Sequence, residues 1–589
     1  MNKNKIIQFA KYIAVFLWLN LLTKTDSFYS VYLLIGILSI IVIAKSKKTS
    51  DHNTWLEYIF AFFLSFAVTL SNYLIFITET TANTLSILIP ILLAFTTFTC
   101  GFIVFLNIIT SARTIYLKTI KKQNDSPQKI FLICFLIFCF IDILVFFTCC
   151  YPGSLTPDSI DEIGQILSGN YSNHHPFYFT MLIYPFISIG TNLFNDINIG
   201  IALYNIFQIL ILSAAFAYSI STLYRVGVSK KLLIILSTIL ALLPYNIIFS
   251  FTVWKDVLFG AAFLFFIVTL YRYFNNISLY KKSKIFQIFL IFISGLTICL
   301  FRSNALVAIF ISTILFFVIF RKKHLKLGII LTLVVVSAFI LKRPILKAIN
   351  VPQPDIIESL SIPSQQIVKT IKVEKANIDS QSLSLINGIA DIDKLTSAYL
   401  PHTQDAIKEI IREEGDQTQL YQKPLDYIKL YLNLGLKYPN HYLSAWIDQT
   451  KGYWNSGYYY TIWYDEIEIN DYDIKRQNDI PFLHSILTNY LNIFMKANFL
   501  RPLISIGLAI WIILLLLYRN VLNKKHELLF LLMPLILTWA TLLIATPVFA
   551  EFRYTYFLFT CLPFLTLITI TNKPSASANS INGKREKKK

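Results

Sequence analysis

The chain has 589 residues, of which 55% are hydrophobic and 14% are charged, and its formal net charge is +19. Apolar runs of more than roughly 18 residues, the length of a membrane-spanning helix, recur along it, which excludes a soluble multidomain protein. The basic residues stand in short clusters between these runs, the pattern of cytoplasmic loops in membrane proteins, so nucleic acid is not an expected partner.

The apolar runs predict an all-α polytopic membrane protein with about fourteen transmembrane helices. We divide the chain into N-terminal transmembrane helices at 1–128, a core at 129–342 and C-terminal transmembrane helices at 499–571. The expected spans are 6–22, 28–44, 55–78, 84–109, 129–150, 199–224, 231–250, 256–274, 285–301, 303–320, 327–342, 499–518, 526–546 and 552–571.

The apolar stretch 176–190 decides the predicted topology. If it lies along the outer face without crossing, every basic cluster falls on the cytoplasmic side, as the positive-inside rule requires. It is also short for a crossing and contains Pro176 and Pro185. This arrangement places both termini in the cytoplasm and leaves 572–589 as a basic, disordered cytoplasmic tail that could touch membrane lipids.

The same topology places residues 343–498 outside the membrane as an extracytoplasmic domain. Charged stretches and prolines replace the long apolar runs there, and the size suits one domain. Leu425, Ile428, Leu432 and Leu436 recur at helical spacing, so we expect a mainly helical domain.

The first outer loop, 151–198, carries the acidic residues of greatest interest. No Lys or Arg occurs between Lys129 and Arg225. Asp158 follows Pro-Gly and Thr-Pro turns at the start of a short helix, where it is either a helix cap or a catalytic base or metal ligand. Asp161 and Glu162 then fall in the first turn, where they compensate the helix dipole or support Asp158.

A histidine pair, His174 and His175, precedes Pro176 in the same loop. Histidines in this position serve as acid/base groups, phosphate donors or metal ligands, or they are ordinary interfacial side chains.

The short outer loops hold few basic residues, namely Lys24, Lys255, Arg302 and Arg553. The positive-inside rule disfavours basic residues in outer loops, so those present there are candidates for a function. We therefore expect Lys255, Arg302 and Arg553 to converge and bind a phosphate or pyrophosphate. The alternative is snorkelling at the interface, with local pairing of Lys255 to Asp256 and of Glu551 to Arg553.

The loop sequence Y-P-G-S-L-T-P-D-S-I with N-H-H-P resembles the first outer loop of the GT-C superfamily, the polyprenyl-phosphate-dependent glycosyltransferases. With W-K-D-V-L-F, F-R-S-N-A-L, S-I-P-S-Q-Q-I and Y-P-N-H-Y-L-S-A-W, it more closely resembles a family of uncharacterised bacterial polytopic membrane proteins related to that fold. The closer resemblance covers about 130–570.

The resemblance implies that Asp158 is the catalytic carboxylate, and it is compatible with a divalent metal, Mg or Mn, that has Asp158 as a ligand. His174 and His175 stand where aminoarabinose transferases have a lysine that contacts the lipid phosphate. The sequence departs there, so that contact passes to Lys255, Arg302 or Arg553, with Asp256 and Glu551 beside them.

The implied function is transfer of a sugar from a polyprenyl-phosphate donor to a cell-surface glycan, teichoic acid or protein, at the outer face of a bacterial plasma membrane. A surface-polysaccharide polymerase or ligase, or a lipid-linked glycan transporter or flippase, remains an alternative.

Overall fold

A computed structural model of the chain describes residues 3–23, 29–45, 54–74, 84–113, 115–120, 125–277, 283–459, 462–477 and 480–571. The predicted tail and Lys24 lie outside the described residues. Within those ranges the chain is built from helices, with isolated bridging residues in place of strands. The predicted all-α polytopic class is therefore confirmed.

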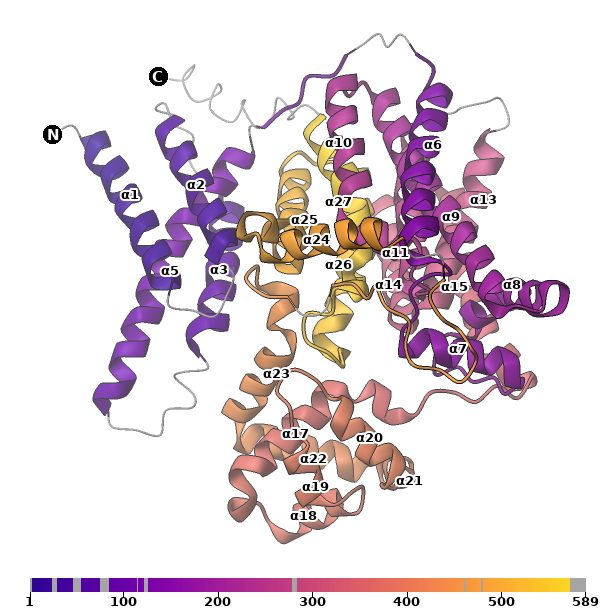
Figure 1. The fold of residues 1–589 in the computed structure, drawn as a ribbon. Helices are drawn as coiled ribbons and strands as arrows, with labels where there is room; N and C mark the ends of the chain where they lie inside the picture. The colour runs from indigo at the N-terminus through magenta and orange to yellow at the C-terminus, as the bar shows by residue number, and fades with distance from the viewer. Residues whose placement is uncertain are drawn as a thin grey trace.

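The membrane bundle has three parts that follow one another along the chain (Figure 1). The N-terminal part comprises α1 (Lys3–Leu22), α2 (Tyr29–Lys45), α3 (Trp55–Thr69) with η1 (Leu70–Leu74), and α5 (Thr84–Ala112). The core comprises α6 (Pro127–Val145) with η2 (Phe146–Cys150), α9 (Ile197–Val226), α10 (Lys230–Leu242), α11 (Pro244–Ser250), α12 (Lys255–Phe274), α13 (Ser283–Phe301), α14 (Ser303–Phe320) and α15 (Leu325–Ile340), which runs on into η3 (Leu341–Ile345) and α16 (Leu346–Ala348). The C-terminal part comprises η6 (Asn498–Ile504), α25 (Ile506–Leu522), α26 (His526–Ala545), η7 (Phe552–Thr555) and α27 (Tyr556–Thr571).

Twelve helices among the described residues are long and apolar enough to cross a membrane, and two bent pairs, α10 with α11 and η6 with α25, bring the number to 14. The fourteen predicted spans differ from this set at two places. Helix α2, which we expected to span, is apolar but has only 17 residues and is shorter than the other candidate spans. The helix Phe177–Phe194, which we expected not to cross, is long and apolar enough to do so. The multi-pass character is shown by either set.

The C-terminal helices are inserted into the core rather than added beside it. Helix α27 packs on α12 and α9, and α26 packs on α14. Helix α12 is buried over nearly its whole length, so it forms the centre of the bundle. One continuous apolar cluster includes residues of all three parts. As a result, a loop that precedes α27 lies beside loops that precede α12 and α14.

Several helices break where the sequence cannot continue them. Leu243 stands before Pro244, which disfavours helical geometry at the preceding residue, and α10 and α11 meet there at 59°. Arg302 alone separates α13 from α14, with extended backbone angles (φ −138°, ψ 125°). At such breaks the backbone groups of the helix ends have no partner within the helix, so polar side chains can be accommodated beside them.

A helical domain projects from one end of the bundle (Figure 1). It comprises η4 (Ile356–Ser359), α17 (Ser361–Glu374), η5 (Lys375–Asn377), α18 (Ser380–Asn387), α19 (Ile392–Ser397), α20 (Asp405–Glu413), α21 (Thr418–Gln422) and α22 (Pro424–Lys437). Its own apolar core runs from Ile357 to Tyr442. Helix α23 (Pro439–Trp454) joins this domain to α25 and α26, and residues from Ile462 onward pack on the bundle.

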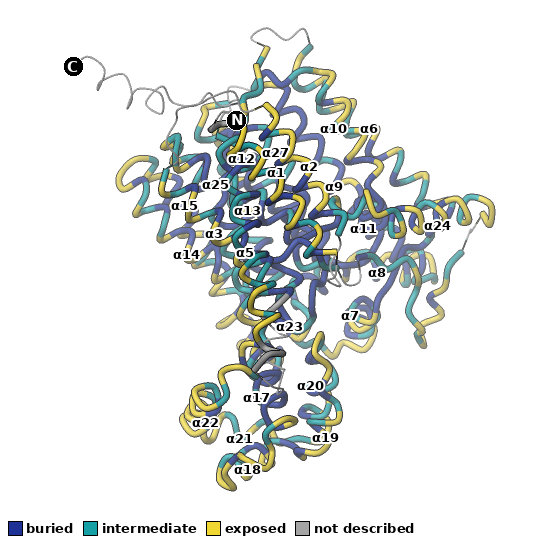
Figure 2. Tube along the Cα trace, turned by 90° about the vertical axis from the view of Figure 1, so that its left-hand side faces the viewer, coloured by how far each residue is buried: buried dark blue, intermediate teal, exposed yellow. Residues whose placement is uncertain are grey.

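Helix α22 has two apolar faces. Leu430 and Leu434 are buried in the domain core, whereas Leu425, Ile428, Leu432 and Leu436 are 68%, 54%, 54% and 82% exposed. Figure 2 shows the exposed side of this helix. The predicted helix is therefore present, and the stripe that predicted it is largely exposed at the surface of the domain.

Three helices lie across the direction of the bundle, namely α7 (Pro157–Ser168), α8 (Phe177–Phe194) and α24 (Pro481–Lys496). In Figure 1, α7 lies nearest the helical domain, whereas α24 crosses near the middle of the bundle. Helix α8 corresponds to the stretch expected not to cross. It packs closely on α9 at Gly190 and Gly200, where neither position leaves room for a side chain. A Cβ on Gly190 would lie 2.4 Å from the backbone nitrogen of Gly200. Pro185 lies within α8.

We expect Asn170 and Asn195, which flank α8, to lie on one side of the membrane and Lys231 on the other, because this keeps the basic clusters together. Each is replaced by cysteine and treated in intact cells with a membrane-impermeant maleimide. Asn170→Cys and Asn195→Cys should react, and Lys231→Cys only after permeabilisation. The seven native cysteines are buried or half-buried, which keeps the background low. Reaction of Asn170→Cys with protection of Asn195→Cys would mean that α8 crosses.

Candidate functional site

The segment that precedes α7 is held on both sides by backbone hydrogen bonds. Ser154 N donates to Phe251 O (3.0 Å) and Val253 N donates to Ser154 O (3.0 Å). On the other side, Leu155 N donates to Glu466 O (3.0 Å), and Glu468 N to Leu155 O (2.9 Å). Two distant segments of the chain, 251–253 and 466–468, thus fix the position at which α7 begins.

Gly153 makes this pairing possible. Its φ of +140° is one that side chains rarely permit, and a Cβ would lie 2.0 Å from Asn205 Nδ2. The same Asn205 nitrogen donates to Pro152 O at 2.8 Å. The turn before α7 therefore requires glycine.

Helix α7 is capped by Thr156 and Ser159 rather than by Asp158. Ser159 Oγ accepts from Thr156 N (3.1 Å) and donates to Val253 O (2.7 Å), and Trp254 Nε1 donates to Thr156 Oγ1 (2.8 Å). The interpretation of Asp158 as the cap is therefore wrong. Its carboxylate is left to face the neighbouring loops.

The Asp158 carboxylate faces three nitrogen-bearing side chains. Oδ2 accepts from Arg553 Nη1 at 2.8 Å and lies 3.6 Å from Lys255 Nζ and 3.9 Å from His175 Nδ1. Burial alone would raise the pKa of this carboxyl, but the charges of Arg553 and Lys255 outweigh it and hold the pKa well below its usual range. With 28% of its side chain exposed, Asp158 is an ionised and accessible carboxylate.

A second ion pair, Arg302 with Asp256, adjoins the first. The Asp256 carboxylate is fully buried and accepts from Arg302. The Arg302 guanidinium carbon lies 4.4 Å from the ring centroid of Tyr554, and that of Arg553 lies 5.4 Å from the same centroid. The structure thus brings Lys255, Arg302 and Arg553 together, as the sequence predicts; their role in phosphate binding stays a prediction. Asp256, which the sequence offered as a local partner of Lys255, pairs instead with Arg302 at the break between the neighbouring helices α13 and α14.

The two histidine rings touch, with centroids 4.8 Å apart, but they face different partners. His175 has only 12% of its side chain exposed, with Nδ1 3.4 Å from Lys255 Nζ and Nε2 3.4 Å from Asp161 Oδ2. Burial, helped by the charge of Lys255, lowers its pKa to about 3, so the ring is neutral near pH 7. His174 turns away from the site, and its Nδ1 lies 3.9 Å from Glu358 Oε1 in the helical domain.

Glu551 adds a group that titrates near neutrality. Its Oε1 lies 3.6 Å from Arg553 Nε, and its side chain is 9% exposed. Burial raises the pKa of Glu551 to about 7, although Arg553 opposes the shift. The local Glu551 to Arg553 contact considered above is therefore present.

Asp161 and Glu162 occupy the second turn of α7, because the helix begins at Pro157. Their assignment to the first turn is corrected. Asp161 is exposed and accepts from Gln165 Nε2 at 2.9 Å. Glu162 is 1% exposed, and burial raises its pKa well above the usual range, so it is a neutral acid beneath the site.

One site residue was missed from the sequence. Lys342 is buried at the end of the α15 segment, where Nζ donates to Ser303 Oγ (2.9 Å) and to Cys299 O (3.4 Å). It therefore holds the break that carries Arg302. The sequence analysis did not single it out, because it is the last residue of the apolar run 327–342. A lysine at the predicted outer end of a span is unusual under the positive-inside rule, and this could have identified it.

A family model for DUF6020, a family of unknown function, matches residues 168–582, more than two thirds of the chain. The chain belongs to the DUF6020 family. Lys255, Arg302 and Arg553 of this DUF6020 protein lie within the matched range, and Asp158 lies just before it. Comparison with curated proteins and with solved structures gives no match.

The residues of the DUF6020 site do not fit the divalent metal implied by the resemblance. Asp158 faces Arg553 and Lys255, whose positive charges oppose a cation at the carboxylate. Among the residues that the structure describes, no three His, Cys, Asp or Glu side chains are grouped as metal ligands. We therefore derive no chemical step through a metal.

Replacing Ser159 by alanine should destabilise the DUF6020 protein by roughly 1 to 3 kcal/mol, because two buried hydrogen bonds at the start of α7 are lost. The measurement is chemical unfolding in mild detergent. Ser168→Ala is the matched control: its exposed hydroxyl accepts from the nearby Asn170 N, so the change should stay within about 0.5 kcal/mol. Equal effects of the two variants would contradict the capping role.

Proposed function

We propose that this DUF6020 protein is a GT-C-like membrane glycosyltransferase that moves a hexosyl or pentosyl group from a polyprenyl-phosphate donor to a cell-surface glycan, teichoic acid or protein. The observation that carries the proposal is the ionised Asp158 carboxylate held between Arg553 and Lys255 at one end of an apolar bundle. This arrangement suits a reaction between an anionic lipid and a hydroxyl group.

The cations supply the binding site for the donor phosphate. Arg553 offers a planar set of donors that matches phosphate oxygens, and Lys255 adds a point charge. Lys255 is also the first residue of α12, and Arg302 precedes α14, so helix N-termini add partial positive charge at the same place. Neutral His175 can donate or accept a hydrogen bond without adding charge.

Asp158 supplies the base. The acceptor hydroxyl oxygen forms a bond to the anomeric carbon, the bond between that carbon and the phosphate oxygen breaks, and the hydroxyl proton passes to Asp158. The departing phosphate keeps the electron pair and is stabilised by Arg553 and Lys255. A bound phosphate competes with Asp158 for Arg553, which raises the basicity of the carboxylate when the donor is present.

The expected setting is the plasma membrane of a bacterium, with both termini in the cytoplasm and the site at the outer face. The apolar bundle suits a donor whose chain stays in lipid. The helical domain lies at the same end as α7 (Figure 1), and we assign it the acceptor side of the reaction.

Asp158→Asn should reduce kcat by on the order of 100-fold or more, because the amide cannot take the proton. The Michaelis constant for the donor should stay the same or fall, since Arg553 and Lys255 lose a competing anion. The assay follows release of polyprenyl phosphate from a panel of polyprenyl-phosphate hexoses and pentoses in proteoliposomes with equal amounts of folded protein.

Asp161→Asn is the matched control, three residues further along the same helix. Its carboxylate is 53% exposed, so activity should stay within about threefold. If Asp158→Asn keeps near wild-type kcat, Asp158 is not the base. If it loses activity only in proportion to folded protein, its role is structural.

The affinity for the donor should weaken as pH rises through about 7, because Glu551 loses its proton and the site becomes less positive. Below that pH the neutral carboxyl leaves the charge of Arg553 available to the phosphate. Glu551→Gln should keep the affinity of the low-pH form and remove the dependence. The check is the Michaelis constant for the donor from pH 5.5 to 8.5; an unchanged profile in Glu551→Gln would exclude Glu551 as the titrating group.

A further inference from the structure

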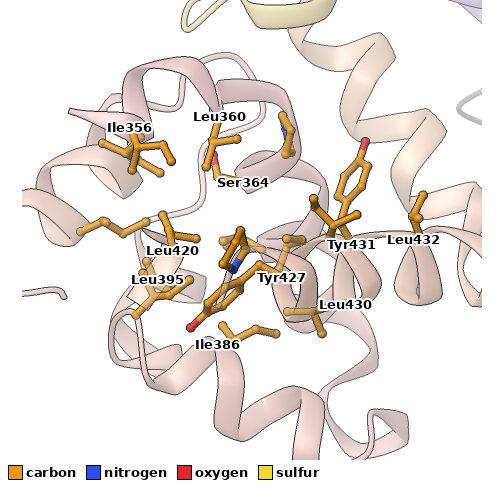
Figure 3. A pocket seen from close by; sticks show the side chains of 18 residues that line it. Ile356, Leu360, Ser364, Ile386, Leu395, Leu420, Tyr427, Leu430, Tyr431 and Leu432 are labelled. Carbon is orange, nitrogen blue, oxygen red and sulfur yellow. The ribbon is translucent and has the colours of Figure 1, made fainter. Parts of the chain in front are cut away.

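The helical domain encloses an apolar cavity of about 350 Å³ (Figure 3). Its walls come from η4, α17, α18, α19, α20, α21 and α22. Figure 3 shows Leu360, Ile386, Leu395, Leu420 and Leu430 around the space. Of the 18 side chains that line it, none is charged.

The few polar groups of the lining already have partners inside the protein. Tyr427 donates to Leu385 O (3.0 Å), Tyr431 to Gln366 Oε1 (2.7 Å), and Ser364 to Ser361 O (3.0 Å). A water molecule needs two to four polar partners in a buried site, and this lining offers little to hold one. The cavity therefore favours an apolar occupant.

The cavity continues onto the surface of the domain. Ile428 and Leu432 line it and are each 54% exposed. Both belong to the exposed stripe of α22, which extends to Leu425 and Leu436. An apolar path thus leads from the outside of the domain into its interior.

We propose that this cavity binds a single hydrocarbon chain of a lipid. A peptide segment would carry backbone N–H and C=O groups into a space without partners, at a high cost in desolvation. A hydrocarbon chain has no such groups, gains free energy from every buried methylene, and is narrow enough to enter a cavity of this volume. Acyl and isoprenoid chains share this chemistry.

This site is separate from the cluster around Asp158 and does not depend on the proposed transfer reaction. One wall nevertheless approaches the loop before α8 through His174. Ile356 and Ile357 of η4 line the cavity, and Glu358 of the same turn accepts from Arg412 and faces His174.

The test is photo-crosslinking of the full-length protein in lipid nanodiscs, without detergent that would compete for the cavity. One arm uses a diazirine-bearing palmitic acid and the other a diazirine-bearing farnesol. Crosslinked peptides are mapped by mass spectrometry. We expect labelling of peptides within 356–432 that saturates with probe concentration and is displaced by the unlabelled compound. The probe that saturates at the lower concentration identifies the chain as acyl or isoprenoid.

Ile367→Trp and Leu420→Trp fill the cavity and should lower labelling of 356–432 by at least about fivefold. Leu436→Ser is the matched control, because Leu436 belongs to the stripe but does not line the cavity; its labelling should be unchanged. Labelling that does not saturate in the wild-type protein, or that persists in filled variants with native protease resistance, would overturn the proposal. If the filled variants do not fold, saturation and displacement in the wild-type protein decide it.

Discussion

The ion pair between Asp158 and Arg553 is the interaction on which the arrangement of the site depends. A charged side chain in an apolar bundle is costly unless it has an opposite charge and hydrogen bonds at hand. Here Asp158 stands at the start of α7 and Arg553 in the turn before the last described helix, α27, and Lys255, at the start of α12, lies beside Asp158. The bundle must therefore bring these two distant parts of the chain together before Asp158 and Arg553 can pair.

The charged residues of the site all lie at or just before the N-terminus of a helix, and the unsatisfied backbone groups of helix ends explain this position. Asp158 and Lys255 stand in the first turns of α7 and α12, Arg302 at the break between α13 and α14, and Arg553 in the turn before α27. At such points backbone groups are not used within a helix, so polar side chains and ligands can meet them. The middle of a span offers neither backbone groups nor water.

Composition and charge were sufficient to predict most of the bundle from the sequence, because lipid tolerates few alternatives to apolar helices. The charge bias also singled out Lys255, Arg302 and Arg553. The cap of α7 could not be predicted, since Ser159 depends on Val253, which is 94 residues away. The sequence also could not show that His175 lies in the site and His174 beside Glu358, because Lys255 and Glu358, which surround them, are distant along the chain. Membrane sidedness rests on the charge rule.

The separation of Asp158 and Arg553 along the chain has a consequence for biosynthesis. They lie 395 residues apart, and at roughly 5 to 20 residues per second a ribosome needs about 20 to 80 seconds to make that stretch. Lys255 is made part-way through this time and can pair with the carboxylate, whereas Arg553 is made only at its end. The charge cluster is completed only when the final helix enters the membrane, so a nascent chain that stops short of α27 keeps a membrane bundle without a finished site.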